Sequence, residues 1–137
     1  MAYWIPKEPL EPGKEYVYKY RLYWSHGLPQ KTSPAKVIST YTGIGGVSGM
    51  LETGKRKFVI DFELPKSKKD IAAGKIVPEV SASEGKIIGT HLIYNPVTKG
   101  PTVYIDFEPN GKTSELRVLL KKDGKTISET WSYQWLP

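Results

Sequence analysis

The sequence contains no cysteine, which excludes a disulfide framework, a thiolate metal site and a cysteine nucleophile. It has only two histidines, His26 and His91, and no His-x-His or His-x-x-x-His spacing, so it predicts no metal centre. No apolar run approaches the ~18 residues of a membrane span. The first residues have neither the basic nor the apolar region of a signal peptide, and we therefore expect none here.

The length and composition are typical of one folded domain. The chain has 137 residues, of which 39% are hydrophobic and 25% are charged. Twenty basic and 14 acidic residues give a formal net charge of +6, which favours anionic partners such as nucleic acid or anionic lipid. The lysines gather in turn-like segments, however, so a solvated surface is the favoured interpretation and an anion-binding surface remains an alternative.

Apolar residues recur at every second position along most of the chain, which is the spacing of half-buried β-strands. This pattern predicts an all-β fold, an antiparallel β-sandwich of about seven to eight strands, with a closed barrel as the alternative. The predicted strands cover residues 16–24, 35–42, 58–64, 76–83, 86–94, 103–108, 116–120 and 127–135.

Short signals between the strands predict the turns. Asp123-Gly124 is the strongest hairpin signal, and Glu84-Gly85 predicts a second tight hairpin. The one helical signal is a Ser-x-x-Asp cap at Ser67, followed by a terminal glycine at Gly74, which predicts one or two helical turns.

Two segments do not have a strand pattern. Residues 43–54 contain five glycines and predict a long flexible loop, of a length that begins to suggest function. Residues 1–14 are rich in proline and predict an extended arm, so the expected organisation is an arm at 1–14 and a sandwich domain at 15–137.

The acidic residues offer two tempting pairs, Asp61 with Glu63 and Asp106 with Glu108. The members of each pair are two residues apart and face the same side of a strand, as in a glycosidase pair. Because they alternate with core-like apolar residues, we interpret them as the solvated face of half-buried strands. No serine elbow, P-loop or dinucleotide fingerprint is present, so we predict no catalytic residue and no cofactor.

Aromatic residues are the most informative class, with 4 Trp, 9 Tyr and 3 Phe. Trp131, Tyr133 and Trp135 share one strand face, which suits either a sandwich core or a platform for sugar rings. We assign Trp131 to the core and leave Trp135 open. Tyr3 and Trp4 are further exposed candidates.

Three stretches together resemble one family: residues 3–24 with YWIPKEPL and YRLYW, the TGIGG run at 42–46, and the ending ETWSYQWLP. They resemble the C-terminal domain of the periplasmic glucan biosynthesis proteins G and D of Gram-negative bacteria. The resemblance implies an immunoglobulin-like fold of the E-set type, a periplasmic location and a role in making osmoregulated β-1,2-glucans. It also implies that glucanase activity lies in a larger N-terminal β-sandwich, and that this chain is an excised domain without catalysis of its own.

The resemblance suggests the larger domain as partner, with glucan as a second candidate. No RNP-like motif is present in the sequence, so no nucleic acid is expected as a partner. Contact with that domain is expected at the N-terminal arm and the glycine segment. An autonomous glucan-binding module is the alternative, and an independent hydrolase is disfavoured by the strand alternation. The candidate carbohydrate or inter-domain contacts are Tyr3, Trp4, Tyr23, Gly43, Gly45, Gly46, Tyr133 and Trp135.

Overall fold

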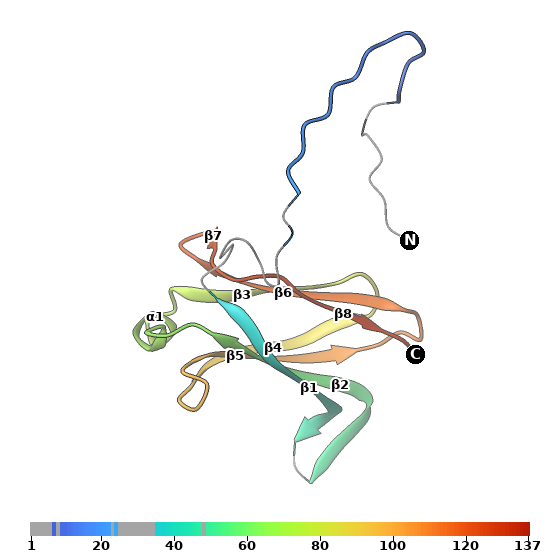
Figure 1. Ribbon diagram of the computed structural model, residues 1–137. Coiled ribbons are helices and arrows are strands. Elements are labelled where there is room, and N and C mark those ends of the chain that lie inside the picture. Colours follow the sequence, from blue (N-terminus) through green and yellow to red (C-terminus); the bar gives the residue numbers. More distant parts are fainter. Residues whose placement is uncertain (1–6, 8, 23, 25–34, 48) are drawn as a thin grey trace. The chain divides into compact units, whose positions relative to one another are not determined.

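A computed structural model describes residues 7, 9–22, 24, 35–47 and 49–137 (Figure 1). The chain divides into two compact units, Met1–Gln30 and Lys31–Pro137, which are described separately. In the first unit, residues 16–22 form no strand, although their alternation predicts one. A strand requires a neighbour that pairs with its backbone N–H and C=O groups, and alternation alone does not supply that neighbour.

The second unit is a two-layered β-sandwich, as the alternating pattern predicts. One sheet has the order β1-β2-β5-β4, and in the other β3, β7 and β8 all pair with β6, with every pairing between strands antiparallel. This is the strand order of constant-type immunoglobulin domains. The strands are β1 Lys36–Val47, β2 Met50–Glu63, β3 Ile76–Ala82, β4 Lys86–Asn95, β5 Gly100–Glu108, β6 Ser114–Lys122, β7 Lys125–Thr126 and β8 Trp131–Trp135, and the helix is α1 Lys68–Ala72.

The core fills the space between the two sheets, and alternate residues of three central strands supply most of it. Each of these side chains has no exposed surface, because successive side chains of a strand point to opposite faces. They are Phe58, Ile60 and Phe62 from β2, Val103, Ile105 and Phe107 from β5, and Leu116, Val118 and Leu120 from β6.

The two predicted hairpins have different outcomes. Asp123-Gly124 joins β6 to β7, and both residues have positive φ angles, as a two-residue hairpin turn requires. Glu84-Gly85 does not make a hairpin, because β3 pairs with β6 whereas β4 pairs with β5. It is instead the connection that carries the chain from one sheet to the other.

The helix is found where the sequence predicts it, but its cap differs. Ser67 occupies the N-cap position, yet its hydroxyl makes no capping hydrogen bond and lies buried without a partner. Gly74 ends the segment with a φ of 66°, a left-handed conformation that glycine adopts without strain.

The predicted glycine loop is wrong. Strands β1 and β2 remain paired as far as Val47 and Met50, so residues 43–54 belong mostly to a long hairpin. Ile44 lies opposite Arg56 whereas Gly45 lies opposite Glu52, which leaves residues 53–55 as a bulge on β2. Figure 1 shows the paired ends of these strands extending beyond the rest of the sandwich.

Candidate functional site

The C-terminal strand β8 directs its aromatic row toward the opposite sheet. The Trp131 and Tyr133 rings are nearly parallel, with centroids 5.8 Å apart, and Phe58 contacts both of them edge-on. The Trp131 indole N–H donates a 2.9 Å hydrogen bond to Thr40 Oγ1. Trp131 is therefore a core residue, as predicted, and Tyr133 is half-buried beside it.

Trp135 lies where the C-terminal strand meets the β1–β2 hairpin. The Arg56 guanidinium lies 5.1 Å from the centroid of the Trp135 ring, within the range of a cation–π contact, and Phe107 meets the ring edge-on at 6.3 Å. The Arg56–Trp135 contact thus joins the aromatic row of β8 to the base of the β1–β2 hairpin. The sequence alone does not show that these two features are neighbours. Tyr133 and Trp135 are both half-buried, so they form no flat exposed platform.

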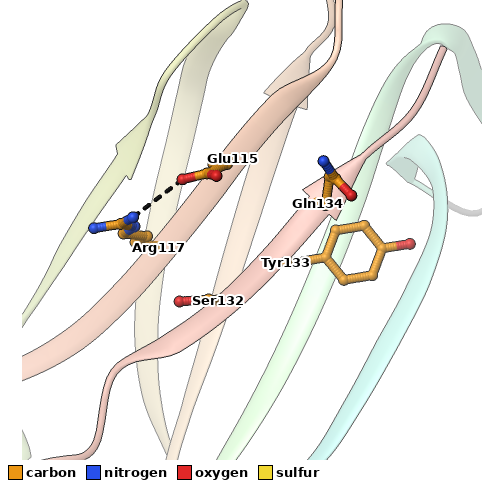
Figure 2. A pocket seen from close by; sticks show the side chains of 5 residues that line it. All are labelled: Glu115, Arg117, Ser132, Tyr133 and Gln134. Carbon is orange, nitrogen blue, oxygen red and sulfur yellow. Dashed lines mark hydrogen bonds and ion pairs between the residues drawn. The ribbon is translucent and has the colours of Figure 1, made fainter. Parts of the chain in front are cut away.

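A shallow hollow of about 210 Å³ lies over β6 and β8 (Figure 2). Arg117 and Glu115 form an ion pair of 3.0 Å in it, and Figure 2 shows Tyr133 pointing away from them. Ser132 and Gln134 supply its remaining polar groups. This hollow presents polar side chains rather than ring faces.

Two of the three candidate glycines are required by the hairpin. A Cβ atom on Gly46, whose φ is 95°, would lie 2.2 Å from the carbonyl oxygen of Met50, and one on Gly45 would lie 2.5 Å from the Lys55 Cβ. A Cβ on Gly43 would meet nothing within 4 Å. Gly45 and Gly46 therefore permit close backbone approach at the bulge, whereas Gly43 leaves open space above its strand.

The β1–β2 hairpin exposes large apolar side chains that sequence reasoning missed. Met50 and Leu51 at its tip are 74% and 64% exposed, and Ile44, before the bulge, is 46% exposed. Apolar residues gathered at the tip of a projecting hairpin are typical of an interaction surface. The adjacent Met50-Leu51 pair inside a glycine-rich segment was the available signal.

One residue of each acidic pair makes structural contacts, Asp61 in the first and Asp106 in the second, whereas Glu63 and Glu108 are exposed. Asp61 is 5% exposed, so its assignment to a solvated face is wrong. Its carboxylate accepts hydrogen bonds from Ser39 Oγ at 2.6 Å and from Thr102 Oγ1, which hold β1, β2 and β5 together. Asp106 forms a 3.3 Å ion pair with Lys57. These contacts occupy the carboxylates in stabilising the sheet.

Surface ion pairs shift several ionisation equilibria. The hydrogen bond from Lys122 Nζ to Asp70, at 2.6 Å, lowers the pKa of Asp70 and raises that of Lys122. The hydrogen bond from Asn110 lowers the pKa of Glu84, with Lys112 contributing through its charge. Asp70, Lys122 and Glu84 are half-buried at the surface, and their charged contacts stabilise the folded state.

The lowered pKa values of Asp70 and Glu84 predict acid sensitivity. A depressed carboxyl pKa stabilises the folded state above the unfolded-state pKa, and this contribution is lost as pH falls through the folded-state pKa. We expect the melting temperature to fall below about pH 4.5, and less steeply in a D70N/E84Q double variant. Scanning calorimetry at low and high salt measures this. Equal slopes in both proteins would contradict the assignment.

Within residues 35–47 and 49–137, no three His, Asp or Glu side chains are grouped to hold a metal ion. Among the described residues, no helix is long and apolar enough to cross a membrane. The candidates Tyr3, Trp4 and Tyr23 lie outside the described residues.

Comparison with known proteins gives a consistent result. A family model described as "Periplasmic glucan biosynthesis protein, MdoG" matches residues 1–135. The chain is 38% identical over its whole length to a probable glucans biosynthesis protein D of Shewanella oneidensis, and 33% identical to glucans biosynthesis protein D of Stenotrophomonas maltophilia. It is also 34% identical, over 98% of its length, to glucans biosynthesis protein G 2 of Shewanella oneidensis. The chain spans about a quarter of the length of these relatives.

Proposed function

Because this chain belongs to the periplasmic glucan biosynthesis (MdoG) family, we propose that it is a non-catalytic domain of a periplasmic glucan-processing protein. Its proposed role is to support a larger domain that acts on osmoregulated β-1,2-glucan. The observation that carries the proposal is that the chain matches only about a quarter of the length of its relatives, so about three quarters of each relative lies outside the match.

The arrangement of the carboxylates supports a non-catalytic role. Glycoside hydrolysis requires two carboxyl groups facing each other across the scissile bond, one of which stays protonated. Asp61 is instead buried among hydroxyl donors, and Asp106 is paired with Lys57. Every carboxylate that lines the three described hollows forms an ion pair, so no two unpaired carboxylates face each other in them.

The β1–β2 hairpin is the proposed contact with the larger domain. Its exposed apolar side chains, Met50 and Leu51 at the tip and Ile44 before the bulge, are surface that a partner domain would bury. We include the N-terminal arm at 1–14, with Tyr3 and Trp4, in this contact, together with Tyr23. The base of the hairpin is fixed to the sandwich by the Arg56–Trp135 contact, which orients the tip.

Incubation with linear β-1,2-glucan tests the proposal. We expect the isolated chain to release no more reducing ends than buffer does. The full-length probable glucans biosynthesis protein D of Shewanella oneidensis is expected to release them. Deleting from that relative the quarter that matches this chain should lower its activity. Hydrolysis by the chain alone, or full activity of the truncated relative, would overturn the proposed division of roles.

A further inference from the structure

The outer face of the sheet β1-β2-β5-β4 carries a row of four side chains, one from each strand, and three of them bear rings. The register places Tyr41 of β1 opposite Val59 of β2, Val59 opposite Tyr104 of β5, and Tyr104 opposite His91 of β4. Tyr41 is 62% exposed and His91 is also exposed, while Val59 and Tyr104 are half-buried. Because neighbouring residues on these strands fill the core, this row faces away from the second sheet.

The next row on the same face combines an ion pair with two glycines. Lys57 and Asp106 lie opposite each other at its centre, and Lys57 Nζ also donates a 2.9 Å hydrogen bond to the carbonyl oxygen of Gly46. Gly43 lies opposite Lys57 at one end, and Gly89 lies opposite Asp106 at the other. A Cβ on Gly43 would meet nothing within 4 Å, so the row is open at that end, whereas one on Gly89 would lie 3.2 Å from Asp106 Oδ2, because the carboxylate lies against this glycine.

A hollow of about 240 Å³ extends this row toward the hairpin. Its charged side chains are two lysines and two carboxylates, Lys55 with Glu52 and Lys57 with Asp106, which form two ion pairs. The hydrogen bond with Glu52 raises the pKa of Lys55, so the lysine stays charged. The hollow therefore offers both donors and acceptors while its formal charges cancel.

This combination identifies the chemistry of the ligand. Ring faces favour a ligand with an apolar C–H surface, and a set of paired donors and acceptors favours hydroxyl groups, which both donate and accept. An anion would meet the carboxylates of Glu52 and Asp106, so the charge balance disfavours phosphates and nucleic acid. A neutral sugar satisfies both requirements.

We propose that the face formed by Tyr41, Tyr104, Lys57 and Asp106 binds a neutral glucose oligosaccharide. The proposal deepens the proposed function and rests on it, because the family context identifies glucan as the sugar. Tyr41 and Tyr104 are separated by two strand spacings, about 10 Å between backbones. Val59 forms a lower floor between them, so the face suits consecutive sugar units rather than one.

The same observations separate this face from the hairpin tip. The tip exposes the large apolar side chains of Met50 and Leu51, which suit a protein partner, whereas charged pairs and glycines interrupt the sugar face. The two surfaces therefore suit different ligands, a protein domain at the tip and a carbohydrate on the sheet.

Titration of the intact chain with linear β-1,2-linked glucose oligosaccharides, followed by amide NMR, tests the proposal. We expect shifts centred on β2 and β5, unchanged by added salt, and about tenfold weaker binding in Y104A. A G43F variant should block the face, because its side chain extends into open space above Lys57. An R117A/Q134A variant in the hollow of Figure 2 is the matched control and should bind as the parent does.

Each outcome decides the proposal. Retained binding in folded Y104A and G43F proteins would overturn it, as would loss of binding in the control variant or collapse of binding in salt. Absence of any shift at millimolar sugar would also overturn it. That result would leave the supporting role intact, because the reducing-end and truncation measurements test that role without requiring sugar binding by this domain.

Discussion

Replacing Phe58 by alanine is expected to lower the free energy of unfolding by about 4 kcal/mol. The Phe58 ring is fully buried and contacts Phe107, Trp131 and Tyr133, with centroid distances of 6.5, 5.8 and 5.1 Å. Its removal would leave a cavity where the two sheets meet, and the rings around it would lose their packing partner.

Urea unfolding followed by tryptophan fluorescence measures this change. In a thermal scan the melting temperature should fall by roughly 10–16 °C. The near-ultraviolet circular dichroism of Trp131 and Tyr133 should weaken. Tyr41→Ala is the matched control, since Tyr41 is 62% exposed on the neighbouring strand and should change stability by less than about 0.5 kcal/mol. Similar losses in both variants would show that the core is not centred on Phe58.

Replacing Gly46 by alanine is expected to open the hairpin tip without unfolding the sandwich. Gly46 has a φ of 95°, and an added Cβ would lie 2.2 Å from the Met50 carbonyl oxygen. A residue forced into such a conformation costs about 2 kcal/mol. The cost is confined to the tip, because the pairs Gly46–Leu51 and Val47–Met50 lie beyond the bulge.

Amide hydrogen exchange measures this local opening. Exchange at Leu51 and Val47 should accelerate roughly thirtyfold, the equivalent of about 2 kcal/mol. The amides of Ile60 and Ile105 should keep their protection. Gly43→Ala is the control, because its Cβ would meet nothing within 4 Å, and it should leave exchange at the tip unchanged. Unchanged exchange in G46A would show that the tip tolerates the added Cβ.

The class of fold and the inner faces of the strands follow from the amino-acid sequence alone. Period-two alternation identified Phe58, Ile60 and Phe62, and likewise Val103, Ile105 and Phe107, as core residues, because alternation alone decides which side chains share a face. The Asp123-Gly124 hairpin turn could also be predicted from the sequence, since its conformation depends on two adjacent residues. The family could also be identified from the sequence, because its signature motifs are local runs of residues.

Which strands are neighbours depends on long-range pairing and cannot be predicted from the local sequence. Glu84-Gly85 has the local signal of a hairpin, yet it joins two sheets, because β3 pairs with β6 and β4 pairs with β5. Glycines at 43–54 suggest flexibility, but Gly45 and Gly46 permit close backbone approach opposite β2. The alternation at 16–22 indicates a strand that the described part of the first unit does not form.

The candidate binding faces depend on the same kind of information. The alternation pattern alone places Asp61 on a solvated face. The strand register puts Ser39 and Thr102 on either side of it, and both donate hydrogen bonds to its carboxylate. Tyr41, Tyr104 and His91 are far apart in sequence, and only the order β1-β2-β5-β4 brings them into one row. Periodicity fixes the face on which a side chain lies, whereas long-range backbone pairing fixes its neighbours on that face, and a binding surface requires both.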